Sequence, residues 1–147
     1  MSSASQRIIV DASTLVAAYG SDGEVRAHWQ NSLGGYKIAI SPEVLIDVEA
    51  KLRNGEVTVP PSGIRAILGA ILERCDIVRP APLRDSKFEN CKEGYLAALA
   101  RHRFADGVPA SFLLTADGVL CGETKIGNCR VLGIAEFCRQ FAGIAAT

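Results

Sequence analysis

The hydrophobic and polar residues divide the chain into two kinds of segment. Short apolar runs, typical of strands buried in a parallel sheet, occupy residues 7–11, 36–40, 76–80, 110–117 and 129–133. Segments with apolar residues at helical spacing lie between and after them, over residues 13–20, 24–34, 42–54, 62–74, 89–104 and 134–144. This alternation predicts one α/β domain, a three-layer α/β/α arrangement around a mainly parallel sheet of four to five strands.

Capping and turn residues support these boundaries. Ser41 is a preferred N-cap, Pro42 suits the first helical position, and Gly55 ends the same helix. Ser62 is the expected N-cap of the following helix, after a break at two prolines. The domain is predicted to span residues 7–143, with residues 1–6 as a polar N-terminal tail.

Composition and charge narrow the class of protein. The chain has 147 residues, enough for one domain with a real core, and its 16 basic and 16 acidic residues give no net charge. A polyanion would therefore need a local basic patch or bound metal ions. No apolar run approaches the roughly 18 residues of a membrane span, and the polar start is unlike a signal peptide. We therefore expect a cytoplasmic protein with no membrane partner.

The cysteines do not form a recognisable framework. They are Cys75, Cys91, Cys121, Cys129 and Cys138. Their number is odd, their spacing is irregular and no CxxC pair occurs, which argues against a disulfide scaffold and a structural zinc site. We expect most of them to be small residues of the core.

Carboxylates stand where the predicted sheet would bind a ligand. Asp11 and Asp117 each end a predicted strand, while Asp47 and Glu93 lie near the starts of helices. Ligands of open parallel sheets bind beyond the carboxyl ends of the strands, so these four acids are expected to converge. Clustered carboxylates stay ionised together when a divalent cation neutralises them, and oxygen ligands favour Mg²⁺ or Mn²⁺ over zinc.

Each acid also has a purely structural interpretation. Asp11 is equally suited to be the N-cap of the helix that follows it. Asp117 precedes Gly118 in an ordinary turn sequence, and Asp47 and Glu93 are typical of solvated helix residues. The order of the four acids along the chain, and no single residue, is what favours a common site.

With the acids in this order, the sequence resembles the PIN domain family, in particular the toxins of bacterial toxin–antitoxin pairs. The resemblance runs from about residue 8 to 141 and is carried by "VDASTLVAA", "SPEVLIDVEAKL", "EGYLAALA", "FLLTADGVL" and the closing "CRVLGIAEFCRQF". The positions that match the acids and hydroxyls of the family blocks are Asp11, Ser13, Asp47, Glu93, Thr115 and Asp117.

The resemblance implies a metal-dependent endoribonuclease that hydrolyses phosphodiester bonds of single-strand-type RNA and leaves a 5′-phosphate and a 3′-hydroxyl. The Mg²⁺ or Mn²⁺ ligands it implies are Asp11, Glu93 and Asp117. Asp47 would hold a second ion or orient a ligand water, and Ser13 and Thr115 would orient water. It further implies a cognate antitoxin protein and a homodimer.

Two departures from the family pattern favour an alternative function. The family usually has Glu at its second acid and Asp at its third, whereas this chain has Asp47 and Glu93. Many members carry a further acid where this chain has Val119. The alternative is a catalytically degenerate PIN-like domain that binds RNA or a protein.

Other enzyme classes fit less well. Phosphoryl-transfer folds with strand-end aspartates need paired acids or Asp-x-Asp, and Asp11 is followed by Ala12 and Ser13. A metal-free ribonuclease would need a histidine pair, but His28 and His102 are far apart in the sequence.

Candidate phosphate contacts are few. Arg101 and Arg103 in "ARHRF" form the best local basic cluster, and Lys125, Lys51 and Arg53 are weaker candidates. A solvated helix end explains the same cluster, because cations favour helix C-termini.

Overall fold

The computed structural model describes residues 6–21, 23–55, 57–83, 86–89, 91 and 93–142. Its strands are β1 (Arg7–Val10), β2 (Lys37–Ile40), β3 (Asp76–Ile77), β4 (Ala110–Leu114), β5 (Lys125–Ile126) and β6 (Cys129–Leu132). The helices are α1 (Ala12–Gly20), α2 (Glu24–Ser32), α3 (Pro42–Arg53), α4 (Pro61–Arg74), α5 (Ser86–Glu89), α6 (Tyr95–Ala100) and α7 (Ile134–Phe137), which continues as a π-helical turn over Cys138–Ala142. The predicted α/β class is therefore confirmed.

The strands form one sheet in the order β3-β2-β1-β4-β6-β5. Every pairing is parallel except that of β5 with β6, and Ile9 in the central β1 pairs with Ala39 on one side and Leu113 on the other. The prediction of four to five strands was wrong by one strand. The additional β5 has only two residues, too short for its hydrophobic pattern to stand out.

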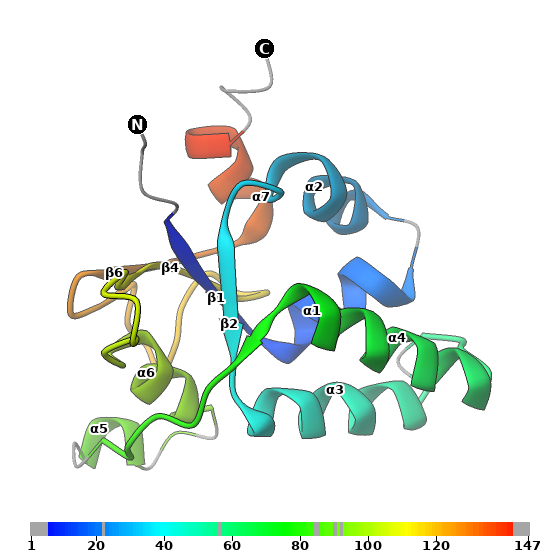
Figure 1. Cartoon of the computed structure of the whole chain (residues 1–147), viewed down its shortest axis with the longest axis horizontal. Coiled ribbons are helices and arrows are strands. Elements are labelled where there is room, and N and C mark those ends of the chain that lie inside the picture. The colour runs from blue at the N-terminus through cyan, green and yellow to red at the C-terminus, as the bar shows by residue number, and fades with distance from the viewer. Residues whose placement is uncertain are drawn as a thin grey trace.

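The core surrounds the middle of this sheet. Ile8, Ile9 and Val10 of β1 are fully buried, as expected for a parallel strand covered on both faces. Helix α1 packs against α2, α3 and α4, whereas α6 packs against β1 and β4. Figure 1 shows α1, α3 and α4 grouped on one side of β1 and β2, with α5 and α6 on the other. No helix among the described residues is long and apolar enough to cross a membrane.

Helix α3 begins at Pro42 and ends before Gly55, as the sequence predicts, although the buried Ser41 hydroxyl makes no capping hydrogen bond. The prediction of Ser62 as an N-cap was wrong, because Pro60 occupies the cap and α4 already begins at Pro61. An N-terminal proline needs no hydrogen-bond acceptor for its nitrogen, so it starts the helix earlier.

The predicted helix over residues 89–104 is much shorter in the structure. Helix α6 covers only Tyr95–Ala100, and the short α5 ends at Glu89. Between them the chain folds back so closely that a Cβ atom on Gly94 would lie 2.0 Å from the carbonyl oxygen of Phe88. Glycine allows this approach, which interrupts the helical pattern.

The cysteine prediction holds for only some of the five. Cys75, Cys129 and Cys138 are free and buried, and burial raises the pKa of the first two thiols to about 12. Cys91 and Cys121 instead form a disulfide with a Cα–Cα distance of 5.8 Å, which corrects our expectation. The bond links two loops that are 30 residues apart, and this proximity arises only from the tertiary fold.

Residues 1–5 and 143 of the predicted tail and domain lie outside the described residues. Gln6, the last residue of the predicted tail, already pairs with the start of β2, because its carbonyl oxygen accepts a 2.9 Å hydrogen bond from the backbone N–H of Lys37.

A candidate acidic site at the carboxyl edge of the sheet

Asp11 follows β1 directly and is the most buried of the predicted acids, with 3% of its surface exposed. Its Oδ1 accepts a 2.8 Å hydrogen bond from the backbone N–H of Thr14, so the N-cap interpretation is confirmed. Its Oδ2 accepts only a long, 3.4 Å hydrogen bond from the N–H of Ala116. Oδ1 therefore caps helix α1, while Oδ2 accepts only one weak hydrogen bond.

Burial raises the pKa of Asp11 above its usual value, because a buried carboxylate has lost its hydration. The hydrogen bonds from Thr14 and Ala116 and the positive charge of Lys51 act in the opposite direction but do not outweigh burial. An ionised Asp11 is thus held at a free-energy cost in the metal-free protein.

Asp47 and Glu93 meet in one cavity. They line a space of about 270 Å³ together with Glu43 and Tyr95, and Ile46 and Ala50 complete its wall. Glu43 and Asp47 are one helical turn apart on α3, which places them on the same face. Glu93 reaches the cavity from the segment that precedes α6. Two of the predicted acids are therefore brought together by elements distant in sequence.

Tyr95 lines the same cavity as Glu43, Asp47 and Glu93. Burial raises the pKa of its phenol well above the usual value, and the negative charges of Asp47, Glu93, Asp11 and Glu43 raise it further. A nearby negative charge disfavours the phenolate, which is itself negative. Tyr95 consequently stays protonated, as a hydrogen-bond donor among acceptors.

Asp117 is exposed on the turn after β4 and does not line this cavity. The turn is built around Thr115, whose buried Oγ1 accepts a 2.8 Å hydrogen bond from the N–H of Gly118 and donates to the carbonyl oxygen of Val119 at 3.5 Å. Ala116, the residue before Asp117, donates to Asp11. Asp117 therefore shares the carboxyl edge with Asp11 but projects toward solvent.

The hydroxyls predicted to orient water have different surroundings. Ser13 is half-buried in the first turn of α1, next to Asp11. The hydroxyl of Thr115 is engaged within its own turn. Of the two hydroxyls, that of Thr115 is therefore the one held by hydrogen bonds within the turn after β4.

The donor chemistry of this edge suits a hard divalent cation, because every candidate ligand is an oxygen. The spacing is wider than a metal site requires. Within the described ranges, no three His, Cys, Asp or Glu side chains lie close enough together to hold a metal ion. For one ion to bind all three predicted ligands, the side chains would have to move closer together than they are in the structure; these ligands are Asp11, Glu93 and Asp117.

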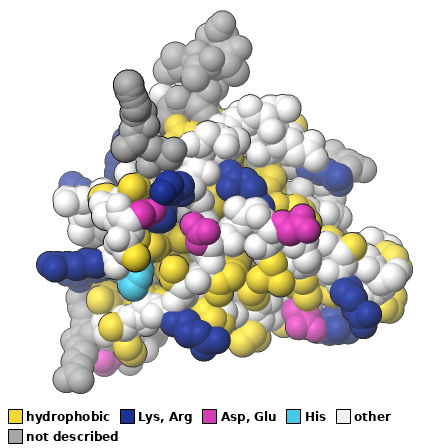
Figure 2. Space-filling view, in the orientation of Figure 1, with side chains coloured by type: hydrophobic (Ala, Val, Ile, Leu, Met, Phe, Trp, Pro, Cys, Tyr) yellow, Lys and Arg dark blue, Asp and Glu magenta, His cyan; other side chains and the backbone are white. Residues whose placement is uncertain are grey.

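The predicted basic residues lie elsewhere. Arg101 and Arg103 line a separate cavity at the start of β4, and Lys125 lines another with Arg130. His28 is 3.3 Å from Glu24, whereas His102 contacts Phe104, so the two histidines do not form a pair. Figure 2 shows acidic and basic side chains interspersed over an apolar surface on one face, in keeping with the zero net charge.

Sequence reasoning did not identify Glu43 or Tyr95 as site residues and ranked Lys51 low. Glu43 and Lys51 each lie four residues from Asp47, a helical spacing from which their shared face could have been inferred. Tyr95 could be found only from the fold, which turns the start of α6 toward α3 at this cavity.

No protein-family model, curated protein or solved structure matches this chain. The resemblance to the PIN family therefore rests on the sequence motifs alone. The arrangement of the acids must be judged on its own geometry.

Proposed function

We propose that this protein is a metal-dependent endoribonuclease with a three-layer, PIN-like fold, acting as the toxin of a toxin–antitoxin pair. The observation that carries the proposal is the cavity that Asp47 and Glu93 share with Tyr95, whose phenol is also close enough to Asp11 to be affected by its charge. A parallel sheet places its ligands at this edge. The mostly parallel strand order is compatible with the proposed fold.

The proposed Mg²⁺ or Mn²⁺ ligands are Asp11, Glu93 and Asp117, with Asp47 as a further ligand or as the partner of a bound water. When bound, the ion would lower the pKa of a water molecule and stabilise charge on the scissile phosphate. The weakly bound Oδ2 of Asp11 is the oxygen available for this role, because Oδ1 caps α1.

The chain itself would supply the contacts to RNA. Tyr95, kept protonated by burial and by the surrounding acids, would donate a hydrogen bond to a phosphate oxygen. The positive charge of Lys51, which acts on Asp11, would offset part of the repulsion between the acids and a polyanion. Ser13 would orient a water molecule beside Asp11.

The proposed partners, apart from RNA, are an antitoxin and a second copy of the chain in the cytoplasm. Exposed apolar side chains on α3 and α4 support a protein partner. Ile46 on α3 is 68% exposed and Leu72 on the neighbouring α4 is 52% exposed. Large exposed apolar side chains of this kind are typical of interaction surfaces.

The second candidate function is a degenerate PIN-like module that binds RNA or protein without cleavage. The specific observation in its favour is that no three acids of the described residues lie within reach of one ion. The exchange of Asp and Glu at positions 47 and 93 also favours it, because Mg²⁺ demands near-ideal ligand geometry.

Cleavage of a mixture of labelled single-stranded RNAs distinguishes the two functions. We would compare wild type with Asp11→Asn in Mg²⁺, in Mn²⁺ and in EDTA, with Glu24→Gln as a control that removes an exposed acid of α2, which does not line the acidic cavity. The nuclease predicts cleavage that needs metal, disappears in Asp11→Asn and persists in Glu24→Gln. RNA that is bound by the folded protein but never cut would establish the binding module instead.

A further inference from the structure

A second cavity lies at the opposite edge of the sheet from Asp11. It has a volume of about 510 Å³ and is lined by residues 100–104, by Gly107, Pro109 and Ala110, and by residues 126–128. Ala110 begins β4, whereas the acidic site adjoins the residues that follow the end of the same strand. Cavities of roughly 300–1,000 Å³ hold cofactor-sized ligands. The proposed nuclease function does not use this one.

The cavity is lined by basic side chains and by no acid of the described residues. Arg101 and Arg103 lie on either side of His102 in the segment that leaves α6, and neither arginine forms an ion pair within the described part of the chain. The nearest acid in sequence, Asp106, is engaged elsewhere. The cavity therefore carries a net positive potential.

Asp106 is held by two other cations. Both of its carboxylate oxygens accept hydrogen bonds from Arg7, at 2.9 and 2.7 Å, and Lys37 lies 2.7 Å from one of them. Together with a hydrogen bond from the N–H of Val108, these cations hold the pKa of Asp106 far below its usual range. The negative charge of Asp106 is thus compensated and also anchors the loop that bears Arg103 and Phe104.

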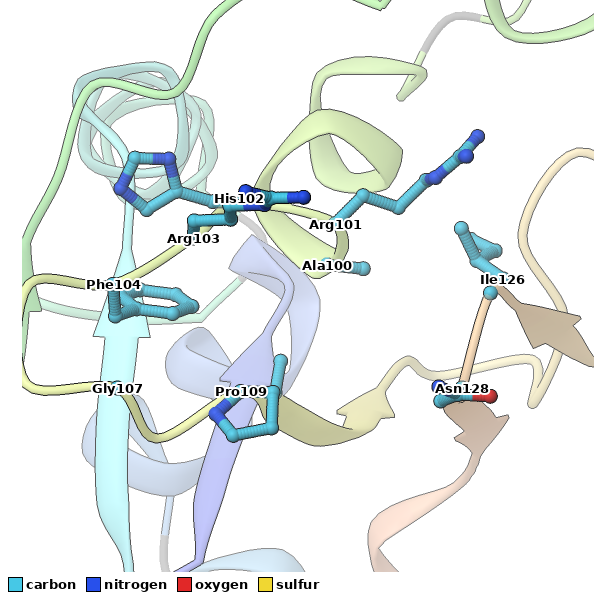
Figure 3. Close-up of a pocket in the computed structure, with 11 residues that line it drawn as sticks. Ala100, Arg101, His102, Arg103, Phe104, Gly107, Pro109, Ile126 and Asn128 are labelled. Carbon is cyan, nitrogen blue, oxygen red and sulfur yellow. The ribbon is translucent and has the colours of Figure 1, made fainter.

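The walls of the cavity are apolar and fixed in place. The ring of Phe104 is stacked by the guanidinium of Arg7 at 3.9 Å and contacted edge-on by His102 at 4.8 Å. Figure 3 shows Phe104 and Pro109 on one side of the cavity and Ile126 and Asn128 on the other, with Arg101 and Arg103 along its upper rim in this view. A preformed apolar cleft with a few polar groups is typical of a small-molecule site.

We propose that this cavity binds a nucleoside phosphate. The arginines suit a phosphate, because guanidinium groups bind it through two parallel hydrogen bonds. The apolar walls suit the planar base, and the side-chain amide of Asn128 can pair with the edge of a base, as asparagine does with adenine. The source is either a free mononucleotide or one nucleotide of a single-stranded RNA, which offer the same chemistry.

Binding can be measured without metal, so the result is independent of the proposed nuclease. Calorimetric titrations in EDTA would compare adenosine monophosphate, adenosine, inorganic phosphate and a short oligoadenylate. We expect one bound nucleotide per chain, with adenosine and phosphate each binding at least about tenfold more weakly, because each makes only part of the contacts. Amide NMR shifts should move at Gly107, Gly127 and Asn128.

The decisive variants are Arg101→Ala combined with Arg103→Ala, and Arg65→Ala as the control. All three arginines are exposed, so the variants should keep the fold. The double variant should bind the nucleotide at least about tenfold more weakly, because it removes the charged hydrogen-bond donors to the phosphate, and Arg65→Ala should bind as wild type does.

Oligonucleotide binding without mononucleotide binding, if lost in the double variant, would identify RNA as the source. Mononucleotide binding that is lost in the double variant would identify the free nucleotide as a sufficient ligand. Absence of both, or binding that the double variant leaves unchanged, would overturn the proposal. Asp11→Asn should bind like wild type, which separates this site from the acidic edge.

Discussion

Replacing Asp11 by Asn should stabilise the metal-free protein near neutral pH. Asn caps helices as well as Asp does, so the 2.8 Å hydrogen bond from Thr14 can be kept. The substitution removes a charge that burial disfavours in the folded state. The same carboxylate is a proposed metal ligand, so stability and function should change in opposite directions.

The magnitude follows from linkage between protonation and folding. Because burial raises the pKa of Asp11 in the folded state above the usual 3.8, the stability it contributes is complete below that value and is lost as the pH rises through the folded pKa. Each unit of such a rise corresponds to about 1.4 kcal/mol. Loss of the long hydrogen bond from Ala116 offsets part of the gain, since an ordinary hydrogen bond contributes about 1 kcal/mol. We expect a net gain in the free energy of unfolding near pH 7.

Urea unfolding in EDTA, followed by fluorescence of the single tryptophan, measures this gain. Trp29 is 7% exposed and therefore reports loss of the core. The advantage of Asp11→Asn should be largest near pH 7 and vanish near pH 3, where the wild-type carboxyl is protonated. Asp117→Asn, at an exposed position of the same edge, should change stability by less than about 0.5 kcal/mol. A destabilised Asp11→Asn variant, or a gain independent of pH, would refute the reasoning.

Three further predictions concern other parts of the molecule. Reducing the disulfide between Cys91 and Cys121 should lower the free energy of unfolding by about 3.5 kcal/mol, because the bond restricts the unfolded chain across a separation of 30 residues. Urea unfolding with and without dithiothreitol measures this loss, and an unchanged midpoint would contradict it. Asp106→Asn should lower the urea midpoint near pH 7, because Arg7 and Lys37 lower the pKa of Asp106 in the folded state. This effect should begin to shrink as the pH falls below the usual value of about 3.8 and should keep shrinking toward the much lower folded pKa; a cost that does not change with pH would argue against the ion pair. Tyr95→Phe should reduce kcat/KM for RNA about tenfold by removing one donor to a charged phosphate, and unchanged kinetics would exclude that contact.

The fold class could be predicted because its central elements are simple. The continuous apolar run of β1 and the Ser41–Pro42 start of α3 reflect local chemistry, and both occur as predicted. The two-residue β5 and the late start of α6 could not be predicted. The first depends on pairing with β6, and the second on the close approach of Gly94 to Phe88, and both contacts exist only in the folded chain.

The candidate site was predictable in outline for the same reason. A carboxylate at the end of a parallel strand must face the carboxyl edge, so the position of Asp11 follows from the strand alone. The shared cavity of Asp47 and Glu93 depends on how α3 and the segment before α6 approach each other. The disulfide of Cys91 depends on another tertiary contact of this segment, with the loop that bears Cys121, and has no signal in the spacing of the cysteines.

Calorimetric titration of the folded protein with Mn²⁺ tests most directly the claim that the acidic edge is a metal site. We expect saturable binding that is abolished by Asp11→Asn and by Glu93→Gln, weakened by Asp47→Asn, and unchanged by the control Glu24→Gln. Absence of binding, or binding that Asp11→Asn and Glu93→Gln leave intact, would contradict the claim that these carboxylates form one site.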